Sequence, residues 1–154
     1  MSSPPLLLLG FGDVGRAIAL VLAERRDPRR ISATTRRAER EAELVAAGVR
    51  AIVAPALGPA HLEELARGAH VVVSFPPDGA TDARVAPACA EAARIVYVSS
   101  TAVYGPRGDV DDATPTDASA PRAGPRLAAE SAWRAQGAIV LRAPAIYGPG
   151  SGLI

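Results

Sequence analysis

Short apolar runs alternate with alanine-rich amphipathic stretches along most of the chain. The apolar runs predict strands at residues 6–9, 31–35, 49–53, 71–75, 95–98 and 138–142. The stretches between them predict helices at residues 14–24, 37–47, 60–67, 81–93 and 125–136. Strand-helix units in succession favour a parallel sheet with right-handed crossovers. The pattern therefore predicts one α/β domain over residues 1–154, a doubly wound parallel sheet of about six strands in the order 3-2-1-4-5-6.

The first apolar run leads into a glycine-rich turn and then a helix, as the pattern G-x-G-x-x-G requires. Gly10 allows a sharp turn, Gly12 has no Cβ to obstruct a pyrophosphate, and Gly15 lets the helix pack closely. The backbone amides at the helix start, with the positive end of its dipole, would hold the phosphates. The alternative is a tight surface turn, which the position between a strand and a helix disfavours. The candidate dinucleotide-binding residues here are Gly10, Phe11, Gly12, Asp13, Val14 and Gly15.

The end of the second predicted strand indicates which dinucleotide binds. An acidic residue there suits the ribose hydroxyls of NAD, whereas arginine suits the 2′-phosphate of NADP. The sequence has Thr35, Arg36 and Arg37, with no carboxylate before Glu39. We therefore predict NADP, with NAD as the second choice. The alternative, that the arginines only begin the next helix, is disfavoured because cations are unfavourable at a helix N-terminus.

Two further strand ends complete the predicted cofactor site. The fourth strand runs into Phe75 and Pro76, in a turn that ends at Gly79, and the fifth runs into Ser99. The carboxyl ends of parallel strands meet at one edge of the sheet, where ligands of such folds bind.

Charge and composition exclude several function classes. The net charge is +1 and no long basic run is present, so nucleic-acid binding is not expected. All 17 basic side chains are arginine, which excludes lysine-dependent mechanisms such as Schiff-base formation. No apolar run approaches the roughly 20 residues of a membrane span, and the N-terminus lacks the features of a signal sequence.

The remaining polar residues offer no metal site. Cys89 is the single cysteine, so we expect a small buried helix residue and a reducing, cytoplasmic setting. His61 and His70 lack partners at ligand spacing, and the acids between residues 109 and 117 lack the spacing of a calcium loop. A small-molecule substrate is expected but not identified, and homo-oligomers are compatible with the sequence.

Three further motifs follow the glycine turn in a fixed order: YVSSTAVYG at 97–105, RLAAE at 126–130 and LRAPAIYGPG at 141–150. With the glycine turn they resemble the NAD-dependent epimerase/dehydratase branch of the short-chain dehydrogenase/reductase superfamily. Leu9 stands where those epimerases carry a first glycine, which is similar to the atypical subgroup of that superfamily.

The resemblance implies roles for several residues. Ser100 matches the Ser or Thr that binds and polarises the substrate oxygen, although it could instead only cap the strand end. The family's catalytic Tyr and Lys align with Arg122 and Arg126, and arginine is no general acid near neutral pH. Arg126 could still contact the cofactor's ribose or phosphate. Tyr104 and Tyr147 are the other tyrosines near the expected site, and packing roles are favoured for both.

We therefore expect an atypical NADP-binding oxidoreductase or epimerase-like protein without the dyad. The alternatives are a non-catalytic NAD(P) sensor that acts through a partner and an inert truncation product. Relatives continue for roughly another hundred residues that build a substrate lobe, so that lobe is expected to be absent here, and the chain is either a fragment or a minimal nucleotide-binding domain.

Overall fold

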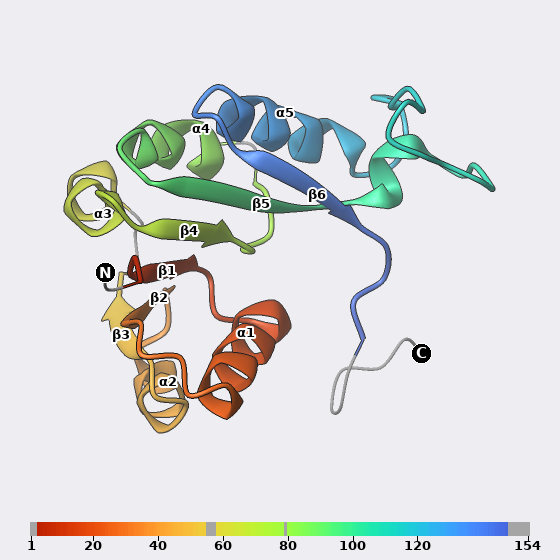
Figure 1. The fold of residues 1–154 in the computed structure, drawn as a ribbon. Coiled ribbons are helices and arrows are strands. Elements are labelled where there is room, and N and C mark those ends of the chain that lie inside the picture. Colours follow the sequence, from red (N-terminus) through yellow and green to blue (C-terminus); the bar gives the residue numbers. More distant parts are fainter. Residues whose placement is uncertain (1–2, 55–57, 79, 148–154) are drawn as a thin grey trace.

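The computed structural model describes residues 3–54, 58–78 and 80–147, and within them the chain forms a six-stranded parallel sheet (Figure 1). Its strands are β1 (Leu6–Leu9), β2 (Ile31–Thr35), β3 (Arg50–Val53), β4 (His70–Val73), β5 (Arg94–Ser100) and β6 (Ile139–Ala143). They are ordered β3-β2-β1-β4-β5-β6, so the predicted α/β fold and strand order are confirmed.

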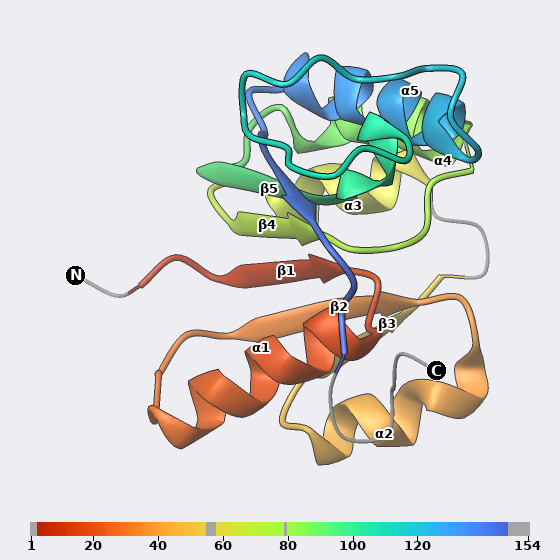
Figure 2. The same ribbon diagram turned by 90° about the vertical axis from the view of Figure 1, so that its right-hand side faces the viewer.

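Helices cover both faces of the sheet, as a doubly wound fold requires. They are α1 (Asp13–Glu24), α2 (Glu41–Ala46), α3 (Pro59–Ala66), α4 (Thr81–Val85) and α5 (Ala123–Arg134), with 3-10 turns η1 (Ala38–Arg40), η2 (Ala86–Cys89) and η3 (Thr101–Tyr104). In Figures 1 and 2, α1 and α2 lie on one face and α3, α4 and α5 on the other. Strand β1, between β2 and β4, is therefore covered on both faces.

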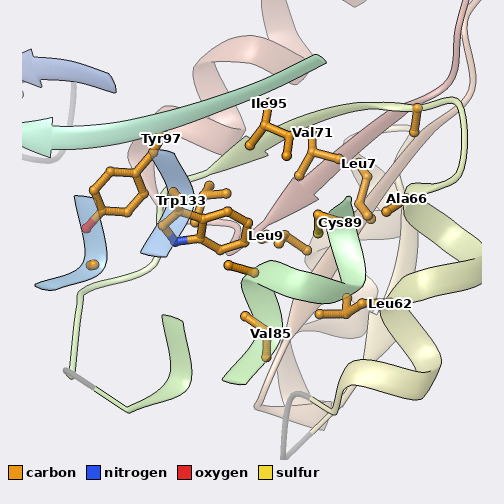
Figure 3. Packing of buried hydrophobic residues seen from close by; sticks show 14 of the residues in the cluster. Leu7, Leu9, Leu62, Ala66, Val71, Val85, Cys89, Ile95, Tyr97 and Trp133 are labelled. Atoms are coloured by element: carbon orange, nitrogen blue, oxygen red, sulfur yellow. The ribbon is translucent and has the colours of Figure 1, made fainter. Parts of the chain in front are cut away.

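The four leucines of β1 divide between two hydrophobic cores. Leu7 and Leu9 pack into the core under α3, α4 and α5, where Trp133 is fully buried (Figure 3). Leu6 and Leu8 pack against α1 and α2. Successive side chains of a strand point to opposite faces, so a run of four leucines can serve both cores.

The structure corrects the boundaries of three predicted helices. The stretch predicted as one helix over 81–93 is the short α4 followed by the 3-10 turn η2, which contains Pro87; proline lacks the N–H needed to continue an α-helix. The helix predicted over 37–47 begins as η1. Helix α5 starts at Ala123, so Pro125 is its third residue and not its first.

The structure also bears on the predictions for Cys89, for a membrane span and for a metal site. Cys89 is fully buried as expected, and burial raises the pKa of its thiol to about 11. Among the described helices, none is long and apolar enough to cross a membrane. Within the described residues no group of three His, Cys, Asp or Glu could hold a metal ion.

Candidate nucleotide-binding site

Gly10 forms the turn between β1 and α1 in a conformation that favours glycine. Its φ is +95°, in the region that L side chains rarely adopt. A Cβ at this position would lie 3.0 Å from the backbone nitrogen of Phe75, in the turn after β4. The sharp turn predicted for Gly10 is therefore present, and the β4 turn packs directly against it.

Gly12 and Gly15 differ in what surrounds them. A Cβ at Gly12, the residue before α1, would meet no described atom within 4 Å, so this side of the turn is open to a ligand. A Cβ at Gly15 would lie 3.0 Å from the Phe11 ring and 3.2 Å from the Gly10 carbonyl oxygen. Gly15 thus allows α1 to pack closely against the glycine turn.

The glycine turn opens into a cleft of about 690 Å³ at the carboxyl edge of the sheet. Its lining contains eight residues predicted from the sequence: Gly10, Phe11, Gly12, Thr35, Arg36, Arg37, Phe75 and Pro76. The sequence analysis missed seven others: Thr34, Arg40, Ala54, Ser74, Asp78, Thr81 and Arg84. Thr34 is the second-last residue of β2, and Ala54 and Ser74 directly follow β3 and β4, a position that could have identified them. Asp13, Val14 and Gly15 form the first turn of α1 beside the cleft.

The described lining of the cleft is rich in arginine. Arg36, Arg37 and Arg40 follow β2, and Arg84 comes from α4. Arg40 is held by Glu43, whose carboxylate accepts two hydrogen bonds of 2.9 Å from its guanidinium. Arg37 immediately precedes η1, so it lines the cleft and also precedes the next helical turn, as the alternative interpretation proposed. The cleft is therefore suited to an anionic ligand.

Asp78 is the acidic residue in this lining. Its carboxylate accepts hydrogen bonds from the Thr81 hydroxyl (2.6 Å) and the backbone N–H groups of Thr81 (2.7 Å) and Ala80 (3.0 Å). These bonds, with a smaller contribution from the charge of Arg36, lower the pKa of Asp78 to about 2. Asp78 therefore carries a negative charge at neutral pH and fixes the start of α4.

The comparison with protein families decides the cofactor class. Residues 6–141 match the family described as the saccharopine dehydrogenase NADP-binding domain. The chain belongs to this family. The predicted NAD(P) cofactor class is thereby confirmed for the domain, and no curated protein matches the sequence.

Three solved structures place this NADP-binding domain among known folds. A conserved protein of unknown function from Silicibacter pomeroyi DSS has 30% identity and a TM-score of 0.79, covering 97% of this chain and 55% of that one. UDP-glucuronic acid 4-epimerase from Bacillus cereus, in complex with NAD, has 14% identity and a TM-score of 0.74, covering 94% and 57%. A short-chain dehydrogenase/reductase superfamily protein from Agrobacterium tumefaciens, with bound NAD, has 20% identity and a TM-score of 0.66, covering 89% and 48%. The chain spans about half the length of these structures, and the two latter likenesses show the fold alone.

Ser99 and Ser100 lie outside the lining of the cleft, although the sequence placed both at the site. Ser99 is 3% exposed, and its hydroxyl donates a 2.5 Å hydrogen bond to Glu130 in the interior of the NADP-binding domain. The Ser100 hydroxyl accepts a 3.2 Å hydrogen bond from the Ala102 N–H, which is the capping arrangement considered as its alternative. Their predicted contacts with cofactor and substrate remain predictions.

Arg126 also lies outside the cleft lining, on α5. Its charge acts on Asp82 and Tyr97, which are both fully buried between α4, α5 and β5. Asp82 accepts a 2.8 Å hydrogen bond from the indole N–H of Trp133, and burial raises the pKa of its carboxyl group. The charge of Arg126 makes only a small contribution that lowers this pKa, and its predicted contact with the cofactor remains a prediction.

Tyr104 and Tyr147, the two other tyrosines near the expected site, have different environments. The Tyr104 hydroxyl accepts a 2.9 Å hydrogen bond from Arg142 and donates a 3.2 Å bond to the Asp111 carbonyl. It faces a separate cleft of about 490 Å³ beside β6. Tyr147 is 75% exposed, so the packing role expected for it is wrong. The motif at 141–150 lies partly outside the described residues, and Gly79 lies outside them.

Glu130 and Arg142 form a buried ion pair that joins α5 to β6. Two hydrogen bonds of 3.0 and 2.7 Å connect the guanidinium to the carboxylate, which is only 3% exposed. Burial alone would raise the pKa of Glu130, but the bonds from Arg142 and Ser99 outweigh it and the net pKa is lowered. The pair therefore connects the last strand of the sheet to its covering helix.

We expect Glu130→Ala to lower the free energy of unfolding by roughly 3 kcal/mol and Tm by about 6 to 12 °C, because it leaves Arg142 half-buried without its counter-ion. Because the folded pKa of Glu130 lies below the unfolded value, the stabilisation is present above the ordinary pKa of glutamate. It is lost as the pH falls through the lowered value. Urea unfolding at neutral and acidic pH measures both effects.

The matched control is Glu91→Ala, since the Glu91–Arg67 pair is 62% exposed on both sides and contributes little. Equal losses of stability for the two variants would contradict a special role for Glu130.

Proposed function

We propose that the domain binds NADP in the cleft beside the glycine turn and prefers it to NAD. One observation supports this proposal above the others. The open side of Gly12 lines the same cleft as Arg36 and Arg37, which follow β2. The first feature suits the pyrophosphate common to both dinucleotides. The second suits the 2′-phosphate, which distinguishes NADP. The residues present thus fit the cofactor of the family.

Among the arginines that line the cleft after β2, Arg37 is the preferred ligand of the 2′-phosphate. Arg40 is committed to Glu43, and Arg36 interacts with the charge of Asp78. Within the described part of the chain the guanidinium of Arg37 forms no hydrogen bond or ion pair, so binding a phosphate would break no existing contact. Arg36 would add to the local positive potential.

Calorimetry should show NADP binding at least about ten-fold more tightly than NAD, because one charge-assisted guanidinium–phosphate bond contributes roughly 1.5 to 3 kcal/mol. Arg37→Ala should remove most of this preference by weakening NADP alone. Arg50→Ala, an exposed arginine at the start of β3 and outside the cleft lining, serves as the control and should change neither affinity. Equal affinities of the unmodified domain for NAD and NADP would contradict the preference.

We further propose that the domain is the nucleotide-binding part of an atypical short-chain dehydrogenase/reductase or epimerase-like protein. The motif order from the glycine turn to the IYGPG segment supports this, and the solved neighbours share the fold. NADP would supply hydride transfer to or from a small carbonyl or sugar-like substrate, and the protein would orient the nucleotide.

A non-catalytic NAD(P) sensor is the second candidate, and a specific observation favours it. The resemblance aligns Arg122 and Arg126 with the family's dyad, and neither they nor Ser100 lines the nucleotide cleft. Turnover measured with small carbonyl compounds and nucleotide sugars separates the two candidates. Binding without turnover supports the sensor, whereas substrate-dependent NADPH oxidation supports the enzyme.

A further inference from the structure

The glycine turn is attached by side chains to both strands that flank β1. The Thr34 hydroxyl, on β2, accepts a 3.0 Å hydrogen bond from the Gly10 N–H. The Ser74 hydroxyl, directly after β4, donates a longer 3.4 Å bond to the Gly10 carbonyl oxygen. Strands β2 and β4 are the two neighbours of β1 in the sheet, so Gly10 is held from both sides.

The Thr34 side chain is buried at the base of the cleft that it lines. Thr34 is 5% exposed, so water has little access to replace its hydroxyl if that group is lost. An N–H left without a partner at this partly buried position is costly, and the turn would adjust to satisfy it. Gly10 is already in a left-handed conformation, and the Phe75 backbone lies 3.0 Å from the place where a Cβ would be. Few other conformations of the turn are therefore available.

We infer that Thr34 is a positioning residue that holds the glycine turn in its nucleotide-binding shape, while Arg36 and Arg37, on the same strand end, select the nucleotide. This inference rests on the proposed function. Thr34 and the arginines should therefore affect binding differently. Thr34 acts on the pyrophosphate-binding turn, which NADP and NAD use alike, so loss of its hydroxyl lowers the affinity for both nucleotides without changing the ratio of the two affinities.

The test is Thr34→Val, which keeps the shape of the side chain and removes the hydroxyl. We expect calorimetric affinities for NADP and NAD to fall by a similar factor of about five to thirty. Thr34→Ser, which keeps the hydroxyl, should bind within about threefold of the unmodified protein. The matched control is Thr114→Val, because the Thr114 hydroxyl accepts a similar 2.9 Å bond from the Asp111 N–H outside the lining of the nucleotide cleft.

Four outcomes separate the inference from the proposed function. Normal binding of both nucleotides by Thr34→Val overturns the inference and leaves the proposed function intact. A loss confined to NADP overturns it as well, because Thr34 would then act on the 2′-phosphate. A loss that Thr34→Ser fails to restore also overturns it. Absence of NADP and NAD binding by the unmodified domain overturns the inference and the proposed function together.

Amide hydrogen exchange keeps the inference testable if Thr34→Val does not fold. In the unmodified domain without nucleotide, the Gly10 amide should exchange at least about ten-fold more slowly than a solvent-exposed loop amide such as Gly108, because Thr34 holds it. Exchange of Gly10 at the rate of Gly108 before nucleotide is added would overturn the inference.

Discussion

Gly12→Val is expected to abolish measurable nucleotide binding while leaving the fold nearly intact. The branched side chain would stand on the open side of the glycine turn, where the pyrophosphate must approach the backbone amides. We expect a loss of at least about 100-fold in affinity for NADP and NAD, equivalent to roughly 3 kcal/mol. Calorimetry with each nucleotide measures the loss.

Stability should hardly change in this variant, which makes the result specific. Gly12 has φ −95°, a value that other residues adopt, and an added Cβ would meet no described atom within 4 Å. Thermal melting should therefore shift by only a few degrees at most, consistent with roughly 1 kcal/mol or less. Gly108→Val, at another glycine with open space around it, is the control and should bind normally. Normal nucleotide binding by Gly12→Val would place the site elsewhere.

Negligible NADPH oxidation with carbonyl or nucleotide-sugar substrates is the second large expected effect. General acid catalysis typically contributes 10²–10⁴-fold, and no described group around the nucleotide cleft offers an acid of suitable pKa. Asp78 is ionised at neutral pH, and the guanidinium groups of Arg122 and Arg126 are no general acids. Tyr104 has its hydroxyl engaged with Arg142 and Asp111. NADPH absorbance in the presence of each substrate class measures the turnover.

The double change Arg122→Tyr with Arg126→Lys should not restore turnover to this chain by itself. Arg122 precedes α5 with a left-handed backbone, φ 66°, so a tyrosine there would be strained and placed outside the helix. Substrate-dependent NADPH oxidation by the unmodified protein would contradict the prediction. Tyr104→Phe and Tyr147→Phe would then show which tyrosine supplies the proton.

The sequence alone determined those features that depend on neighbouring residues. Four consecutive leucines followed by the glycine pattern fixed β1, the turn and α1, because strand burial and left-handed backbone are local requirements. The alternation of apolar runs with helical stretches predicted the strand order, since right-handed crossovers leave few topologies. Arg36 and Arg37 could also be predicted from the sequence. They directly follow a strand whose carboxyl end lies at the edge of the sheet where ligands bind.

Only the tertiary structure decided which side chains meet across the sheet and its helices. Thr34 and Ser74 lie 24 and 64 residues from Gly10, and the strand order alone brings them to it. In β5 the two-residue alternation turns Ser99 inward to Glu130, whereas the sequence predicted that it contacts the cofactor. Arg126 was predicted to contact the cofactor from its place in a motif, and in the folded domain its charge also acts on the buried Asp82 of another helix. Such pairings depend on the packing of elements far apart in the chain, because only the folded sheet and its helices bring these side chains together.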